Sequence, residues 1–346
     1  MRLIIQIPCW NEEQTLPQAF AALPRSVPGF DTVETLVVDD GSTDRTVEVA
    51  RQLGVTHVLS LVTHQGLAAA FQRGVLECLR LGADVVVNTD ADNQYCADDI
   101  PALVAPILSG EADYVIGDRS VESLPHFSWI KKRLQRFGSY VVRVASRTSI
   151  PDTTSGFRAI SRRAILQLSV HSNYTYTHET LIQAGRKDIP VVSIKVRVSP
   201  VTRPSRLFRS IPRYVLRSAD TIIRIYLLYN AFRFLSACAL GALALSTGLV
   251  AIHVGVTAVG SAPGLGLLVG AGALALVAFQ LLLVACLADL LAVNRRLLEE
   301  QLYYMRQAFF APAAAVEPGK GSEGDADGGG VPATPTDESA ARLRTG

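Results

Sequence analysis

The stretch Val85-Val86-Val87-Asn88-Thr89-Asp90-Ala91-Asp92-Asn93-Gln94 joins an apolar run to two carboxylates that stand one residue apart. Three valines before a polar break are typical of a buried strand in a parallel sheet, and the carboxyl end of such a strand is where α/β proteins bind ligands. Because residues two apart share a face of an extended chain, Asp90, Asp92 and the Gln94 amide can converge on one divalent cation. Two solvated turn carboxylates are the alternative interpretation of so short a motif.

Polar groups also follow two earlier strands of the expected sheet. Asn11-Glu12 comes after an apolar strand at 2–8, and Asp39-Asp40 closes a strand at 35–39. The carboxyl ends of parallel strands meet at one edge of a sheet, so these groups should gather beside the carboxylate pair. The glycine signatures of Rossmann dinucleotide binders and P-loop proteins are absent after the first strand, which disfavours hydride transfer and kinase chemistry. A nucleotide diphosphate would here be held by a metal.

Helical patterns alternate with these strands. The expected strands lie at 2–8, 35–39, 57–61, 85–87, 114–116 and 189–196, and the expected helices end near 22 and 54 or span 67–81 and 98–108. Ser42 or Thr43 would cap the second helix. Strands that alternate with helices of this length predict an α/β fold, with a parallel sheet covered on both faces and the last strand near its edge.

Three later segments also carry polar groups. Gly117-Asp118-Arg119 follows the fifth strand, and residues 129–136 form a basic, amphipathic segment that includes Lys132 and Arg133. A solvated helix face is the alternative interpretation of that segment. The turn-rich loop 151–158 enters a strand, and its Asp152 is either a helix cap or an active-site acid.

A long apolar run predicts membrane spans. No Asp, Glu, Lys or Arg occurs from Phe234 to Ala288, and Gly260-Ser261-Ala262-Pro263-Gly264 interrupts the run midway. Each half, roughly 23 residues, can cross a hydrocarbon core about 30 Å thick as a helix. A hairpin of two spans over 232–293 is therefore expected, with a wholly buried soluble helix pair as the alternative.

Basic residues orient this hairpin. Arg217, Arg224 and Arg233 precede the first span, Arg295 and Arg296 follow the second, and the connecting turn has no charge. Lys and Arg beside spans stay in the cytoplasm, so the N-terminal part and both chain ends are predicted at the cytoplasmic face of the inner membrane. The five cysteines have no paired spacing, which fits a reducing compartment and disfavours a zinc site or a disulfide framework.

The segments around the hairpin differ in composition. Residues 201–231 carry arginines at helical spacing opposite isoleucines and valines, as in a helix that lies in the lipid headgroup layer. Residues 294–310 are expected to form a cytoplasmic helix, and 311–346 cannot bury enough apolar area to offset its ordering entropy, which predicts disorder. Small faces within the spans favour homo-oligomerisation through the hairpins, and they are provided by Gly241, Gly248, Gly266, Gly270 and Gly272.

Taken together, the motifs resemble the family 2 glycosyltransferases of GT-A fold. They are Ile7-Pro8-x-x-Asn11-Glu12, Val37-Val38-Asp39-Asp40-Gly41-Ser42-x-Asp44, Asp90-Ala91-Asp92-x-Gln94, Gly117-x-Arg119 and Ser155-Gly156-Phe157-Arg158. More narrowly, roughly residues 3–300 resemble the polyprenyl-phosphate glycosyltransferases, such as dolichyl-phosphate mannose synthases and the bacterial undecaprenyl-phosphate glucosyltransferases with a C-terminal membrane hairpin. The resemblance implies a Rossmann-like, nucleotide-sugar-binding GT-A catalytic domain over 1–200.

The resemblance also implies roles for single residues. The residues expected to bind the nucleotide sugar are Pro8, Asn11, Glu12, Asp39, Asp40 and Asp90. The residues expected to hold Mg²⁺ or Mn²⁺ are Asp90, Asp92 and Gln94. The acceptor phosphate would contact Arg119, Lys132, Arg133 and Arg203, and the catalytic set would be Asp92, Arg119, Lys132 and Arg133. Three features depart from the family pattern. His64 replaces an asparagine before Gly66, the basic residues at 131–136 do not align to a single family position, and residues 203–206 replace a Gly-Ser-Lys-rich segment.

The function implied by the resemblance is transfer of a hexose from a nucleoside-diphosphate sugar, of the UDP-glucose or GDP-mannose class, to a polyprenyl phosphate. The transfer would invert the anomeric carbon of the sugar. Its product would supply lipid-linked sugar for glycan or cell-envelope assembly. A lipid phosphate is anionic at neutral pH and needs cation contacts rather than a base. The partners are a sugar donor, a lipid acceptor and the membrane, with no nucleic acid. A processive polysaccharide synthase, which needs more spans, and a catalytically silent membrane scaffold are the alternatives.

Overall fold

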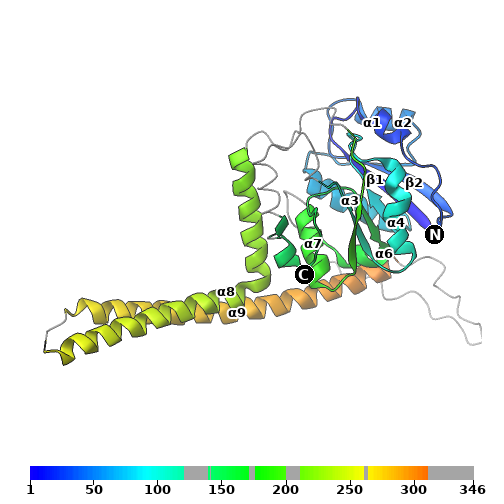
Figure 1. The fold of residues 1–346 in the computed structure, drawn as a ribbon. Helices are drawn as coiled ribbons and strands as arrows, with labels where there is room; N and C mark the ends of the chain where they lie inside the picture. Colours follow the sequence, from blue (N-terminus) through cyan, green and yellow to red (C-terminus); the bar gives the residue numbers. More distant parts are fainter. Residues whose placement is uncertain (121–138, 141, 171–175, 200–210, 261–263, 311–346) are drawn as a thin grey trace, which may run out of the picture. The chain divides into compact units, whose positions relative to one another are not determined.

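The structure, a computed structural model, describes residues 1–120, 139–140, 142–170, 176–199, 211–260 and 264–310, and of 211–229 it describes the backbone alone (Figure 1). The strands in these ranges are β1 Arg2–Cys9, β2 Thr32–Asp39, β3 His57–Ser60, β4 Val85–Asn88, β5 Tyr114–Asp118, β6 Arg158–Ser161 and β7 Val191–Lys195. The helices are α1 Leu16–Ala21, α2 Thr46–Gln52, α3 Leu67–Arg80, η1 Ala97–Asp99, α4 Ile100–Leu108, α6 Arg162–Gln167, α7 Tyr176–Arg186, α8 Ile211–Ala258 and α9 Gly266–Phe309.

The strands form one mixed sheet in the order β3-β2-β1-β4-β6-β5-β7. The expectation of an entirely parallel sheet is wrong for β6, which runs antiparallel to both β4 and β5. The reason is the path of the chain: β5 ends at the carboxyl edge, and loop 151–157 brings the chain back into the sheet from that same edge. The α/β class is confirmed, and β7 lies at the sheet edge as expected.

Helices cover both faces of the sheet, and each face has its own apolar core. On one face α3, α6 and α7 pack against strand residues such as Ile4 and Val86. On the other face α1, α2 and α4 pack against their neighbours in the strands, such as Ile5 and Val87. The alternation follows from the period of two in a strand, and with both faces covered the strands read as continuous apolar runs.

Helix α2 begins at Thr46, later than expected from a cap at Ser42 or Thr43. The position before α2 is Arg45, which makes no side-chain cap. The Ser42 hydroxyl instead accepts from the Asn11 N–H at 2.9 Å, and the Thr43 N–H donates to Asn11 Oδ1 at 2.8 Å. The capping prediction is therefore wrong, because these two residues bind the loop after β1 and not the helix end.

The two C-terminal helices are each long and apolar enough to span a membrane, over Asn230–Ala258 and Gly266–Phe309. Helix α8 bends at Asn230, where φ is −133° and ψ is 22° (Figure 1). Helix α9 continues without a break from the apolar part through residues 294–309. At 1.5 Å per residue, its 44 residues measure about 66 Å, well beyond a hydrocarbon core of about 30 Å.

Small side chains line the seam between α8 and α9. Ser246 donates from its hydroxyl to the Ala271 carbonyl at 2.7 Å, and the buried alanines of α9 recur every seven residues at 271, 278 and 285. Of the five glycines expected to provide packing faces, Gly270 alone would bring a Cβ within 4 Å of a neighbour, Leu249. Oligomerisation through the remaining glycines stays a prediction.

The last turns of α9 dock on the sheet domain. Arg306 Nη1 donates to the Leu168 carbonyl at 2.7 Å, at the C-terminal end of α6, where carbonyl groups attract a cation. Lys187 of the α7 end pairs with Glu299 at 3.0 Å, and Tyr303 packs against the core. The helix that carries the second span is thus fastened to the domain that carries the carboxylates.

Candidate active site

The carboxylate pair lies in the loop after β4, at the carboxyl edge of the sheet. Asp90 sits directly over Gly156, since a Cβ placed on that glycine would lie 3.1 Å from Asp90 Oδ2. Burial and the neighbouring Asp92 carboxylate raise the pKa of Asp90 to about 7. Asp92 Oδ1 accepts from the Gln94 N–H at 3.2 Å, so the loop turns back on itself. Negative charge is therefore concentrated in a partly buried site.

A buried polar network holds the peptide under Asp90 in place. Asn88 Nδ2 donates to the Gly156 carbonyl at 2.8 Å and to the Tyr176 hydroxyl at 3.0 Å. The Gly156 N–H donates to the Tyr95 hydroxyl at 2.9 Å. The sequence patterns did not indicate a role for Asn88, Tyr95 or Tyr176, although Asn88 ends a run of valines and is a polar residue in an apolar strand. Their hydrogen bonds fix the position of the Gly156 backbone, which we call the Gly156 floor and against which the Asp90 carboxylate packs.

Substituting Gly156 by alanine is expected to lower the catalytic rate about tenfold, because the new methyl group would press on Asp90 Oδ2 and on the Tyr176 hydroxyl, each 3.1 Å away. The backbone of Gly156 is not left-handed, so the melting temperature should change little. Initial rates at saturating cation would measure the effect. Gly54→Ala, at an open site with positive φ, is the control for a glycine whose loss costs stability alone. Equal activity of Gly156→Ala and wild type would show that Asp90 does not need its present position.

Arg119 is held by a buried acid from the loop before β6. Its Nε donates to Asp152 Oδ2 at 2.7 Å, and its Nη2 donates to Asp152 Oδ1 at 3.0 Å and to the Thr154 hydroxyl at 2.7 Å. Burial alone would raise the pKa of Asp152, but the guanidinium outweighs burial and lowers it. Asp152 therefore does not cap a helix, and its lowered pKa keeps the carboxyl group ionised. The carboxylate orients Arg119 beside the carboxylate pair.

One edge of that guanidinium is still available. Among the described residues, Arg119 Nη1 donates no hydrogen bond, and the side chain is 18% exposed. The charge of Arg119 also acts on Asp90, where it opposes the effects of burial and of Asp92 on the pKa. Arg119 thus lies between a fixed anion and the carboxylate site, with donor capacity left for a further anion.

Arg158, the first residue of β6, has a structural role. Its side chain is fully buried, with Nε donating to the Ser155 carbonyl at 2.7 Å and Nη2 to the Thr153 carbonyl at 3.0 Å. These bonds shape loop 151–157, which carries both Asp152 and Gly156. Burial together with the Arg158 charge lowers the pKa of His178 to about 4, so that imidazole is neutral at physiological pH.

The residues expected to bind the donor nucleoside gather at the ends of β1 and β2. Pro8 lies in β1 opposite Val38, and Asp39 Oδ1 accepts from the Ser42 N–H at 3.1 Å. The Asp40 carboxylate accepts from the Gln65 and Gly66 N–H groups, both at 2.8 Å. These contacts build the rim of the site, and donor binding by these residues stays a prediction.

Asn11 and Glu12 connect that rim to α2. Asn11 adopts a left-handed backbone with φ of 55°, a conformation that asparagine tolerates well. The Glu12 N–H donates to the Thr46 hydroxyl at 2.8 Å, at the start of α2. The ring of Trp10 stacks on His64 with centroids 4.2 Å apart, and both side chains are partly exposed. This aromatic pair, which sequence reasoning overlooked, forms a wall beside Asp39 and Asp40.

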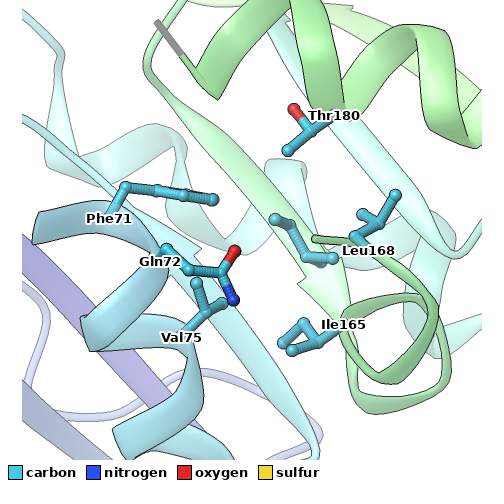
Figure 2. A pocket seen from close by; sticks show the side chains of 7 residues that line it. Phe71, Gln72, Val75, Ile165, Leu168 and Thr180 are labelled. Carbon is cyan, nitrogen blue, oxygen red and sulfur yellow. The ribbon is translucent and has the colours of Figure 1, made fainter. Parts of the chain in front are cut away.

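The acceptor side is described only in part. Lys132, Arg133 and Arg203 lie outside the described residues, so their roles stay predictions. A crevice between α3 and the α6–α7 region is lined mainly by apolar groups, among them Phe71 and Val75 (Figure 2). It contains no charged side chain and is a packing gap, not a site for phosphorylated substrates.

The oxygen groups present suit a hard divalent cation that also binds substrate. Within the described residues, no cluster of three or more His, Cys, Asp or Glu side chains is arranged to hold a metal ion. Magnesium is commonly bound by one or two carboxylates together with substrate phosphates and water. Asp90 and Asp92, with the Gln94 amide nearby in sequence, fit that pattern, and burial together with the neighbouring Asp92 carboxylate raises the pKa of Asp90.

The sequence of this chain is similar to that of known glycosyltransferases. Residues 4–168 match Glycosyl transferase family 2. An uncharacterized glycosyltransferase of Mycobacterium tuberculosis is 33% identical over 199 residues, which is 57% of this chain and 85% of that protein. The undecaprenyl-phosphate mannosyltransferase of Micrococcus luteus is 34% identical over 46% of this chain and 66% of its own length. The polyprenol monophosphomannose synthase of Mycolicibacterium smegmatis is 30% identical over 49% and 65%.

Among solved structures, glucosyl-3-phosphoglycerate synthase from Mycobacterium tuberculosis with phosphoglyceric acid has a TM-score of 0.50 and 21% identity. The match covers 64% of this chain and 79% of that one, and at this identity it shows a common fold alone. The motifs at the strand ends, the mixed sheet and the extent of the sequence matches all indicate the same family. The chain therefore belongs to glycosyltransferase family 2, with a GT-A-like α/β domain followed by two apolar helices.

Proposed function

We propose that this glycosyltransferase transfers a hexose from a nucleoside-diphosphate sugar to a polyprenyl phosphate at the cytoplasmic face of a membrane. The observation that carries the proposal is the placement of Arg119, clamped by Asp152, beside the Asp90/Asp92 pair in a chain that continues into two apolar helices. One site thus offers a cation-binding end and an anion-binding end, as a reaction between two phosphorylated substrates requires.

On the donor side, Asp90, Asp92 and Gln94 would hold Mg²⁺ or Mn²⁺. When bound, that ion neutralises charge on the departing diphosphate. The chain's own contribution is position: the Gly156 floor holds Asp90, and the rim built by Asp39 and Asp40 faces the nucleoside. The names of the Micrococcus and Mycolicibacterium relatives favour mannose, so GDP-mannose is the first donor to test and UDP-glucose the second.

On the acceptor side, Arg119 receives the lipid phosphate through its available Nη1 edge, with Lys132, Arg133 and Arg203 as further contacts. The phosphate oxygen is already anionic at neutral pH, so no carboxylate has to act as a base. The fixed guanidinium brings the two anionic substrates together and orients the attacking oxygen. Attack on the anomeric carbon then displaces the nucleoside diphosphate and inverts that carbon.

The membrane placement rests on the surface of α8 and α9. Large apolar side chains remain exposed along both helices, including Leu245, Leu276, Leu282 and Leu290. A soluble protein rarely leaves so long an apolar surface in water. Arg295 and Arg296 follow the apolar part of α9, and basic residues beside a span favour a cytoplasmic position for its docked end.

Native membranes carrying the chain should retain it after washing with high salt and with alkaline carbonate, and should release it only into detergent. A variant with Leu276→Arg and Leu282→Arg in the exposed face of α9 should lose most of this retention, whereas Arg306→Lys, at the docked end, should keep it. Release of the wild-type chain by carbonate would mean that the helices form a soluble pair.

The reaction itself is tested by incubating detergent-solubilised protein with undecaprenyl phosphate, Mn²⁺ and radiolabelled nucleotide sugars. We expect a chloroform-soluble labelled product with a single donor, labile to mild acid as a sugar phosphodiester. Label in a polymer that does not enter chloroform would indicate a processive synthase. Protein that gives no product with any donor would favour a membrane scaffold.

A further inference from the structure

The chain that leaves the sheet crosses the carboxylate loop on its way to the membrane helices. We define the carboxylate loop as residues 90–96 and the clamp segment as residues 196–199. The Val196 N–H still bonds to β5, donating to the Asp118 carbonyl at 2.9 Å. Beyond it, Val198 pairs with Tyr95 in an antiparallel bridge. Residues 200–210 then connect the clamp segment to the start of α8.

Two backbone hydrogen bonds flank that bridge. The Cys96 N–H donates to the Arg197 carbonyl at 3.3 Å, and the Ser199 N–H donates to the Gln94 carbonyl at 2.8 Å. Gln94 is two residues from Asp92, whose Oδ1 accepts from the Gln94 N–H. The clamp segment is thus bonded to both sides of Tyr95, the residue whose hydroxyl receives the Gly156 N–H.

A charged pair locks the clamp segment to the helix that follows the loop. Arg197 donates to Asp99 from its backbone N–H at 2.7 Å and from Nε at 2.9 Å, and its Nη2 lies 2.7 Å from the same carboxylate. The Asp99 side chain is 14% exposed and the Arg197 side chain 64%. Asp99 closes η1 and precedes α4, so the loop is held at its far end by a side chain from the clamp segment.

We propose that the clamp segment positions the carboxylate loop for its cation, and that Arg197 is the positioning residue through its bonds to Asp99. The role given to the cation rests on the proposed function. The loop needs such a partner because it contains no helix or strand of its own before η1, and Asn93 in it is left-handed with φ of 54°. Small displacements of metal-binding carboxylates weaken binding strongly, so a loop tied at one end only would bind poorly.

The test compares Arg197→Ala and Arg197→Lys with Arg163→Ala in the full chain in detergent. Arg163 pairs with Asp113 on the far side of the domain and is 67% exposed, so it is a matched control for losing a half-exposed arginine pair. Electron paramagnetic resonance of free Mn²⁺, with UDP and separately with GDP present, measures cation binding without turnover. We expect about tenfold weaker binding in Arg197→Ala, partial recovery in Arg197→Lys and no change in Arg163→Ala.

Hydrogen exchange supplies the second readout. In Arg197→Ala, faster exchange should be confined to peptides that cover 94–99 and 196–199, with the melting temperature close to that of Arg163→Ala. Asp99→Asn should reproduce this pattern from the other side of the pair. Unchanged exchange at 94–99, or the same loss of Mn²⁺ binding in Arg163→Ala, would overturn the proposal. A wild-type chain that binds no Mn²⁺ with either nucleotide would overturn the metal assignment, and exchange at 94–99 would then decide whether Arg197 holds the loop.

Discussion

Replacing Asp92 by asparagine is expected to lower the rate of sugar transfer by about a hundredfold or more, while the protein stays folded. The substitution removes one of two neighbouring carboxylates and with it much of the attraction for a divalent cation. The carbonyl oxygen of asparagine can still accept the bond from the Gln94 N–H, so the turn of the loop survives. Loss of the Asp92 charge also removes one of the causes that raise the pKa of Asp90.

The measurement is the initial rate as a function of Mn²⁺ concentration, together with the melting temperature. Asp188→Asn is the control, because Asp188 is an exposed, left-handed residue far from the site in which asparagine fits equally well. We expect Asp92→Asn to need much more Mn²⁺ and to reach a lower maximal rate, and Asp188→Asn to behave as wild type. Wild-type rates in Asp92→Asn would remove this carboxylate from the cation site.

The α/β class and the edge that carries the site were predictable because local patterns encode them. Valine runs such as 85–87 mark strands that are covered on both faces, and polar residues after Pro8 and Asp39 mark their carboxyl ends. The direction of β6 was not predictable in this way. Its four residues are fully buried and equally suited to either direction, and the direction depends on where loop 151–157 returns to the sheet.

The internal contacts of the site were also hidden from sequence patterns. Arg119 and Asp152 are 33 residues apart and come from different loops, so nothing local indicates that they pair. The donor contact of Asp40 stays a prediction, and the motif does not indicate that its carboxylate also accepts from the backbone N–H groups of residues 65 and 66. A carboxylate that bonds backbone amides and one that binds a ligand look alike in a motif, since both follow a strand and precede a turn.

Replacing Asp152 by alanine is expected to destabilise the protein by about 3 kcal/mol and to abolish most activity. The reason is that Asp152 is 2% exposed and its removal leaves the Arg119 guanidinium buried without its partner. Because the folded-state pKa of Asp152 is lowered, its contribution is present above the unfolded pKa of about 3.9 and is lost as the pH falls through the folded value. The stability gap between wild type and Asp152→Ala should therefore be full near neutral pH and narrow in strong acid. Urea unfolding at a series of pH values measures it.

The double variant Asp152→Ala with Arg119→Met separates folding from chemistry. Methionine removes the uncompensated charge and fills similar space, so the double variant should regain much of the stability that Asp152→Ala loses. It should nevertheless stay inactive, because no guanidinium is left to receive the acceptor phosphate, while Mn²⁺ binding in the presence of nucleotide persists. A double variant as unstable as Asp152→Ala would mean that Asp152 stabilises loop 151–157 through Thr154 and not through Arg119. A stable double variant that transfers sugar at the wild-type rate would mean that the acceptor phosphate is bound elsewhere.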